Sequence, residues 1–214
     1  MYYKSITTPV ISSIVKMLVR RMYYKSIITT PVIGSIVKTL VKQQCYKCLP
    51  AILEWINEIT TYYKQNAPYT SELNISRLSN YYSQQLLQNT QVAIVKRCPL
   101  PPLAKFGIKG MSVYETWEPK GVQYKDMYFV RKDLKYWNVV HFHELVHAIQ
   151  WQILQEKIYM NLYCTGIIEK GYRQSPLEEM AWRLQQSFEY NKISFDVSNI
   201  VRIELEPYLT QCRY

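Results

Sequence analysis

The chain has 214 residues, of which 48% are hydrophobic and 20% charged, the proportions of a globular protein with a hydrophobic core. It contains no apolar run of about 18 residues, so we expect no transmembrane helix, and Pro9 and Lys16 interrupt the apolar start that a signal peptide requires. The five cysteines are odd in number and irregularly spaced, which argues against a disulfide framework. We therefore expect a cytoplasmic protein.

The net charge of +10 is concentrated in the first quarter of the chain. Residues 1–49 contain eight Lys or Arg and no Asp or Glu. Residues 50–214 carry a net charge of only +2, because they contain 18 basic and 16 acidic residues. Domains that bind nucleic acids usually contain clearly more basic than acidic residues within the folded domain itself. Since residues 50–214 are nearly neutral, we expect no nucleic-acid partner.

Residues 1–42 contain a tandem repeat. The segment Met1–Ile11 recurs, with one inserted Ile, as Met22–Ile33. Each copy predicts a basic amphipathic helix that begins near a Thr-Pro pair. Such helices either pack on the rest of the protein or contact an anionic membrane surface. We expect residues 1–48 to form a separate basic segment and residues 49–214 to form the main domain.

Helical and strand patterns alternate between this segment and the histidines of the chain. Apolar side chains recur at helical spacing over 50–65, beginning at Pro50, and again over 76–89. Strands are predicted over 91–97 and 123–131, where β-branched and aromatic residues gather. Near the other end of the chain, Pro207 is expected to limit any helix in the tail.

All three histidines lie within residues 141–147, where His143-Glu144-Leu145-Val146-His147 forms an H-E-x-x-H pattern. On a helix, positions i and i+4 share one face, so both imidazoles of the pattern can bind one Zn²⁺. Glu144 would then lie beside the metal as a proton acceptor. His141 would either orient a ligand or be an ordinary polar residue at the turn into the helix. We predict one helix from His143 to about residue 157 and another over 158–169, which Gly171 ends.

The pattern is short and also arises by chance on buried helices, so a third ligand is required. Ser175 and Pro176 predict the start of a helix that runs to about Tyr190. Glu178 lies in its first turn and is the preferred ligand, with Glu179 as the alternative. Both carboxylates could instead be structural, because Ser175-x-x-Glu178 is also a capping box and acidic side chains favour a helix N-terminus. Three protein ligands with one open position form the catalytic arrangement of zinc.

These residues resemble the zincin metallopeptidases, and specifically the gluzincin branch, in which H-E-x-x-H precedes a helix that bears Glu. A longer string is similar to a group of small, uncharacterised bacterial zinc peptidases over about residues 90–190; it comprises Tyr128–Arg131, His141–Trp151 and Gly171–Glu178. The resemblance selects Glu178 over Glu179. It implies an α+β, zincin-like fold, in which a small mixed or antiparallel sheet packs on the active-site helix and the second ligand helix, with further helices at the N-terminus. The third metzincin histidine is absent, because Ile153 occupies its place.

We therefore expect a zinc-dependent hydrolase, specifically a metallopeptidase that acts on a peptide or protein. Glu144 would be the general base, and Tyr172 or Tyr163 would stabilise the oxyanion, although most tyrosines in a chain with 20 of them are structural. The strand over 123–131 would pair with an extended substrate. Two alternatives belong to other classes: a non-catalytic zincin-fold protein that only holds zinc, and a membrane- or partner-binding module that uses the basic N-terminal helices.

Overall fold

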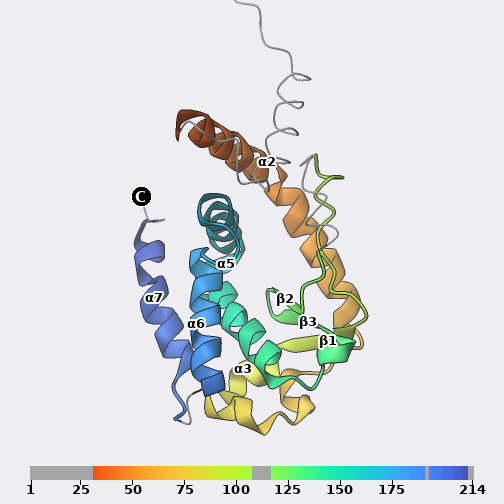
Figure 1. The fold of residues 1–214 in the computed structure, drawn as a ribbon. Coiled ribbons are helices and arrows are strands. Elements are labelled where there is room, and N and C mark those ends of the chain that lie inside the picture. The colour runs from red at the N-terminus through yellow and green to blue at the C-terminus, as the bar shows by residue number, and fades with distance from the viewer. Residues whose placement is uncertain (1–30, 108–116, 191–192, 212–214) are drawn as a thin grey trace, which may run out of the picture. The chain divides into compact units, whose positions relative to one another are not determined.

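The computed structural model describes residues 31–107, 117–190 and 193–211 (Figure 1). The chain divides into two compact units: residues 1–52 with 100–117, and residues 53–99 with 118–214. The first copy of the repeat and residues 22–30 of the second lie outside the described residues, so most of the segment considered for a membrane contact, residues 1–42, lies outside them too.

The helix α2 (Pro31–Lys64) is continuous and begins at the proline of the second repeat, as its Thr-Pro pair predicts. It passes through Pro50, so the prediction that a separate helix begins there is wrong. A proline inside a helix removes one backbone hydrogen bond, but buried residues recur at helical spacing on both sides of it, at Val41 and Cys45 before it and at Ile52 and Ile56 after it. The predicted boundary between residues 48 and 49 falls inside α2. The four described cysteines are free thiols, and the thiol of Cys48 donates to the carbonyl of Phe106 over 2.8 Å.

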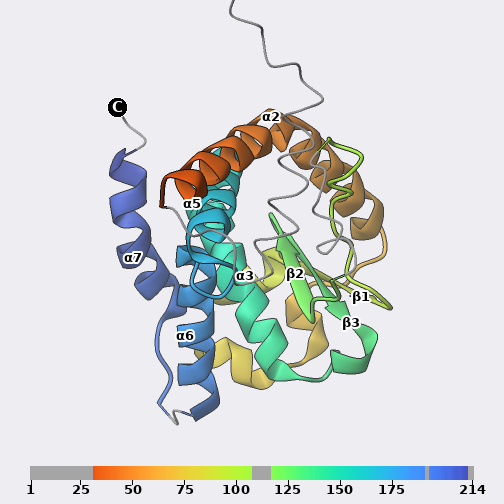
Figure 2. The same ribbon diagram turned by 45° about the horizontal axis from the view of Figure 1, so that its top comes forward.

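The second unit is built around α5 (Asn138–Lys170). This helix contacts α6 (Pro176–Tyr190), α7 (Val197–Gln211) and two strands of the sheet. Figures 1 and 2 show the three helices side by side, with the sheet across α5 from α6. Phe142 of α5 stacks on Phe188 of α6, with ring centroids 4.3 Å apart, and both rings are fully buried. Because α5 lies between the sheet and these two helices, its side chains contact the sheet on one side and α6 and α7 on the other.

The sheet is mixed and has the order β1-β3-β2. β1 (Gln91–Val95) confirms the strand predicted over 91–97 and pairs parallel with β3 (Met127–Arg131). β2 (Gly121–Tyr124) pairs antiparallel with β3. The single strand predicted over 123–131 is therefore wrong, because the chain reverses at Lys125, whose φ of 57° lies in the left-handed region. A lysine there gives none of the Asn-Gly or Gly signal that usually marks such a turn.

Two layers of helix enclose the sheet. On one face, Trp55 of α2 meets Tyr124 and Tyr63 meets Phe129, in both cases edge to face. Side chains alternate along a strand, so Gly121 and Gln123 point to the opposite face, where α5 lies. The active-site helix of the sequence prediction therefore packs on the sheet, in agreement with an α+β fold.

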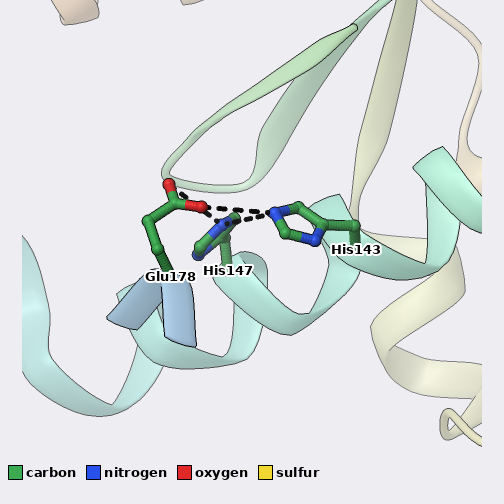
Figure 3. Close-up of side chains that lie close together, drawn as sticks. All are labelled: His143, His147 and Glu178. Atoms are coloured by element: carbon green, nitrogen blue, oxygen red, sulfur yellow. Dashed lines mark hydrogen bonds and ion pairs between the residues drawn. The ribbon is translucent and has the colours of Figure 1, made fainter. Parts of the chain in front are cut away.

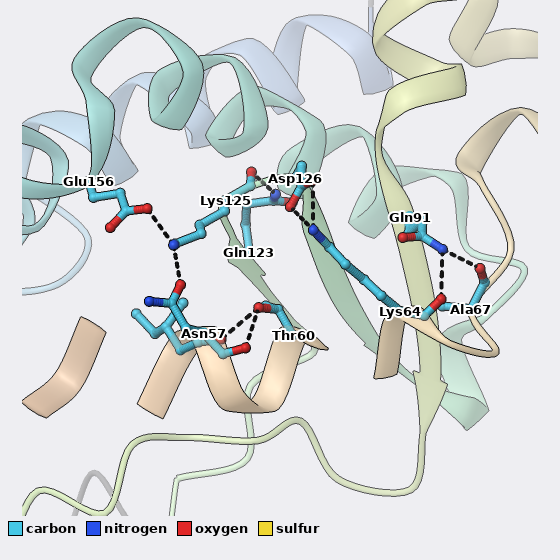
Figure 4. Close-up of polar contacts among 10 residues, drawn as sticks. Asn57, Thr60, Lys64, Ala67, Gln91, Gln123, Lys125, Asp126 and Glu156 are labelled. Atoms are coloured by element: carbon cyan, nitrogen blue, oxygen red, sulfur yellow. Dashed lines mark hydrogen bonds and ion pairs between the residues drawn. The ribbon is translucent and has the colours of Figure 1, made fainter. Parts of the chain in front are cut away.

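Ion pairs and hydrogen bonds hold the turn between β2 and β3 (Figure 4). The ammonium of Lys125 contacts both Glu156 of α5 and Asn57 of α2. Asp126 pairs with Lys64 over 2.6 Å. These groups are partly exposed, so each pair contributes little free energy. Together they fix the position of β2 along α5.

Two helical runs meet within α5, as predicted, although the break falls at Gln155 rather than after residue 157. Gln155 has φ 60° and ψ 167°, a conformation that costs a non-glycine residue about 1–3 kcal/mol. Gly171 ends the helix, and its N–H donates to the carbonyl of Ile167.

The remaining elements correct two predictions. The helix expected over 76–89 is divided into η2 (Ser76–Asn80) and α3 (Gln84–Asn89). Pro207 does not limit the tail, because α7 continues through it to Gln211. Short 3₁₀ turns η1 (Thr70–Leu73) and η3 (Lys132–Leu134) connect the other segments. None of the helices in the described ranges is long and apolar enough to cross a membrane.

Candidate metal centre

His143 and His147 lie one turn apart on α5 and point to the same side of the helix (Figure 3). Both side chains are buried, with 6% and 4% of their surface exposed. Their Nε2 atoms are 3.2 Å apart. The spacing of the H-E-x-x-H pattern therefore places two nitrogen donors side by side, as predicted.

Glu178 reaches the same point from the first turn of α6 (Figure 3). Its Oε2 is 3.5 Å from Nε2 of His143, and its Oε1 is 3.6 Å from Nε2 of His147. Only 2% of Glu178 is exposed, whereas Glu179 is exposed to solvent. Among the two acidic candidates from the sequence, Glu178 is the one that joins the histidines.

The capping box is not formed. The hydroxyl of Ser175 donates to the carbonyl of Tyr172 over 2.8 Å, and the carboxylate of Glu178 turns toward the histidines. The start of α6 is held close to α5 at Gly166, where a Cβ would lie 2.8 Å from Cδ of Pro176. This close approach brings the first turn of α6, and with it Glu178, to the histidines.

Three ligand atoms, one from each of these residues, lie within 4.8 Å of one another, and their separations fit a metal ion. Ligand atoms that bind Zn²⁺ tetrahedrally at about 2.0–2.1 Å are roughly 3.3–3.4 Å apart. The two Nε2 atoms are 3.2 Å apart, and the two oxygens of Glu178 lie 3.5 Å and 3.6 Å from the Nε2 of His143 and of His147, respectively. Oε2 of Glu178 is also buried without a hydrogen-bond partner among the described residues. The cluster could therefore hold a divalent metal ion, and its geometry does not choose among the metals that accept two imidazoles and a carboxylate.

Without a metal, burial and the charges within the cluster shift the pKa of each of its three members. Burial lowers the pKa of His147, but the Glu178 carboxylate outweighs burial and raises that pKa to about 9. Burial raises the pKa of Glu178, but the two histidines outweigh it and lower that pKa well below its ordinary value. Burial also lowers the pKa of His143, which is therefore neutral at pH 7. A divalent cation at this point would replace the proton on His147 and supply the charge that Glu178 requires.

Glu144 is buried beside the cluster but does not belong to it. Only 4% of its side chain is exposed, and burial raises its pKa to about 8, while His147 opposes this shift. The edge strand passes directly over its carboxylate, since a Cβ on Gly121 would lie 2.5 Å from Oε1 of Glu144. A nearby divalent cation would lower the pKa of Glu144 again. Glu144 is therefore placed next to a metal without being needed to hold it.

Tyr172 lies close to both carboxylates. Burial raises its pKa, and so do the charges of Glu178 and Glu144 and a hydrogen bond to Glu178. Burial, followed by the charge of Glu178, likewise raises the pKa of Tyr163. Both phenols are thus protonated at neutral pH and can donate a hydrogen bond.

His141 does not join the cluster. Its Nδ1 accepts from the hydroxyl of Tyr128 over 2.9 Å, and its Nε2 donates to the carbonyl of Lys135 over 2.8 Å. It therefore links β3 to the start of α5. Of the two roles considered for His141, this is the structural one, at the turn into the helix.

Gln150 is a polar contact of the site that sequence reasoning missed. It is fully buried, and its Oε1 accepts from Nδ1 of His147 over 2.7 Å. Its Nε2 donates to the carbonyl of Leu177 in α6. In the sequence, Gln150 reads as part of a polar helix face, because nothing in the local pattern reveals that α6 covers it.

A pocket of about 940 Å³ opens on another side of α5, where Ile149, Gln152 and Ile153 line it together with parts of η2, α3 and α7. Neither the three residues of the candidate centre nor Glu144 lines this pocket. The chemistry described above is therefore separate from it. Neither a known family, nor a curated protein, nor a solved structure matches this chain.

Proposed function

We propose that this protein is a zinc-dependent metallopeptidase with a zincin-like fold, in which His143, His147 and Glu178 hold the metal. The observation that carries the proposal is the buried convergence of two imidazoles and a carboxylate from two helices, with Glu144 beside them. Zinc bound by three protein ligands keeps a position open for water or substrate. Zinc in such a site lowers the pKa of a bound water toward neutrality and polarises a carbonyl.

The residues of the chain then have distinct roles. Glu144 takes a proton from the attacking water and passes it to the leaving amine, as a general base and then a general acid. Tyr172, protonated and next to both carboxylates, would turn its one O–H from Glu178 to the oxyanion that develops on the substrate carbonyl. Burial of the three ligands and Glu144 excludes bulk water, which strengthens each of these interactions.

The edge strand β2 supports a peptide as the substrate. The N–H of Arg131 donates to the carbonyl of Lys120, so hydrogen-bonded and non-hydrogen-bonded pairs alternate from this point. The backbone groups of Gly121 and Gln123 consequently point away from β3, and no described strand pairs with that edge. An extended peptide could pair there beside Glu144. This role moves from the predicted strand over 123–131 to β2, because β3 is central and already paired on both sides.

Glu144 also favours catalysis over simple metal storage. The metal needs only the three ligands, yet a carboxylate is buried next to them at a cost in free energy. A non-catalytic zinc-binding protein would gain stability from an apolar residue at this position. The remaining alternative, a membrane- or partner-binding module, depends on residues 1–42, of which residues 1–30 lie outside the described part.

Two measurements test the proposal. Purified protein should contain about one zinc per chain by elemental analysis, and it should cleave members of a mixed peptide library analysed by mass spectrometry. Glu144→Gln should keep the zinc and lose the cleavage, because it removes only the proton acceptor. Full turnover by Glu144→Gln would refute the mechanism, and a folded wild-type protein that takes up no zinc would refute the site.

A further inference from the structure

Gln150 connects the two helices that supply the metal ligands. Its amide lies between His147 on α5 and Leu177, the residue before Glu178 on α6. It is fully buried, so neither end of the amide can exchange its partner for bulk water. A buried polar side chain with partners on both helices fixes their relative position as well as its own.

The direction of this amide is determined by the groups around it. The carbonyl of Leu177 can only accept, so it requires the NH₂ end of Gln150, at 3.1 Å. The same NH₂ group also lies 3.4 Å from the sulfur of Met180, a weak acceptor. The oxygen of the amide must therefore face His147, at 2.7 Å.

The oxygen of Gln150 can only accept, so Nδ1 of His147 must carry the proton. In the neutral ring this leaves a lone pair on Nε2, the atom that faces His143 and Glu178. The other tautomer would place a proton where the metal has to bind. Nδ1 of His143, by contrast, is buried without a hydrogen-bond partner among the described residues, so control of this kind acts on His147.

We propose that Gln150 is a positioning residue that selects the metal-binding tautomer of His147 and ties it to the helix that carries Glu178. The inference rests on the proposed metal site. Partners of this kind commonly change metal affinity by about 10- to 100-fold. Two functions of one amide can be separated, because Gln150→Glu keeps an acceptor for His147 but loses the donor to Leu177, whereas Gln150→Leu loses both.

The test measures the zinc dissociation constant by competition with a chelating dye. It also measures the tautomers of the three histidines in zinc-free protein, by long-range ¹H–¹⁵N correlation of the imidazole rings, at a pH above the value of about 9 to which the pKa of His147 is raised, so that this ring is neutral. Gln150→Leu should weaken zinc binding by about 10- to 100-fold and should abolish the fixed Nδ1–H form of His147. Gln150→Glu should keep the fixed Nδ1–H form, since a carboxylate is at least as good an acceptor, and should weaken zinc binding less than Gln150→Leu, because it loses only the donor to Leu177. Gln152→Leu, on the exposed side of the same helix, should match the wild type in both measurements.

Equal losses of affinity in Gln150→Leu and Gln150→Glu would overturn the inference, and so would an unchanged tautomer in Gln150→Leu. If Gln150→Leu does not fold, Gln150→Met, which matches glutamine in length, takes its place under the same criteria. A wild-type protein that binds no zinc would refute the proposed function. Normal zinc binding by both the wild type and Gln150→Leu would refute only the role of Gln150.

Discussion

Gly121 is the position where a single methyl group should separate catalysis from metal binding. A Cβ at this position would lie 2.5 Å from Oε1 of Glu144 and 2.9 Å from its Cγ and Cδ, where ordinary contacts begin at 3.4 Å. Gly121→Ala must therefore displace the carboxylate or the strand by about 0.9 Å. A displacement of about 1 Å at a catalytic group can lower the rate by roughly 100-fold, and overpacking costs about 1–3 kcal/mol of stability. Zinc binding should persist, because none of the ligands is among the atoms that this Cβ meets.

The assay for Gly121→Ala combines kcat/KM on a peptide cleaved by the wild type with the zinc dissociation constant. Gly166→Ala is the matched control, since its Cβ would lie 2.8 Å from Cδ of Pro176 and 3.0 Å from Cβ of Ser175. That contact displaces the start of α6 and with it Glu178, so zinc binding and cleavage should fall together. If Gly121→Ala weakens zinc as much as Gly166→Ala, or cleaves at the wild-type rate, the placement of Glu144 under β2 is wrong.

Three further predictions test the ligands, the break in α5 and the repeat. Glu178→Ala should weaken zinc binding by more than about 100-fold, because it removes a ligand rather than a supporting group. Glu179 is exposed, so Glu179→Ala should leave zinc binding unchanged. Similar zinc dissociation constants for the two variants would exclude Glu178 as the ligand. Gln155→Gly should raise the free energy of unfolding in urea by about 1 kcal/mol by relieving its φ of 60°, whereas Gln152→Gly, within the regular helix, should lower it by about 1 kcal/mol. Deletion of residues 1–21 should leave zinc content and the urea midpoint unchanged, because residues 22–42 repeat that segment; aggregation of the truncated protein would contradict this.

The sequence predicts the candidate centre better than it predicts the sheet. The positions of His143 and His147 follow from helical periodicity alone, and Ser175-Pro176 correctly marks where α6 begins. Both signals are local, since each depends on residues within one or two turns. The choice between ligand and capping box at Glu178 is not local, because it depends on α6 lying against α5.

The errors arise where tertiary contacts override local preference. Lys125 reverses the chain without a turn signal, and its contacts with Glu156 and Asn57 hold that turn in place. Pro50 and Pro207 lie inside helices because each removes only one hydrogen bond from a long element. No local sequence pattern marks Gln150 as part of the site, since its contact with α6 is made to a carbonyl 27 residues further along the chain.

Two features of the centre are costly to the fold, and metal binding alone accounts for neither. A carboxylic acid is buried at Glu144, where its raised pKa reflects the free energy needed to ionise it there. A glycine occupies β2 at position 121, where a larger residue would pack better in a strand but would displace that acid. The glycine and the buried acid explain each other, because the missing side chain at Gly121 leaves the space that the Glu144 carboxylate fills. A site that only stored zinc would need neither the acid nor the space that the acid fills, whereas a hydrolase needs a base held next to the metal. The pairing of Gly121 with Glu144 is therefore a stronger argument for catalysis than the three ligands by themselves.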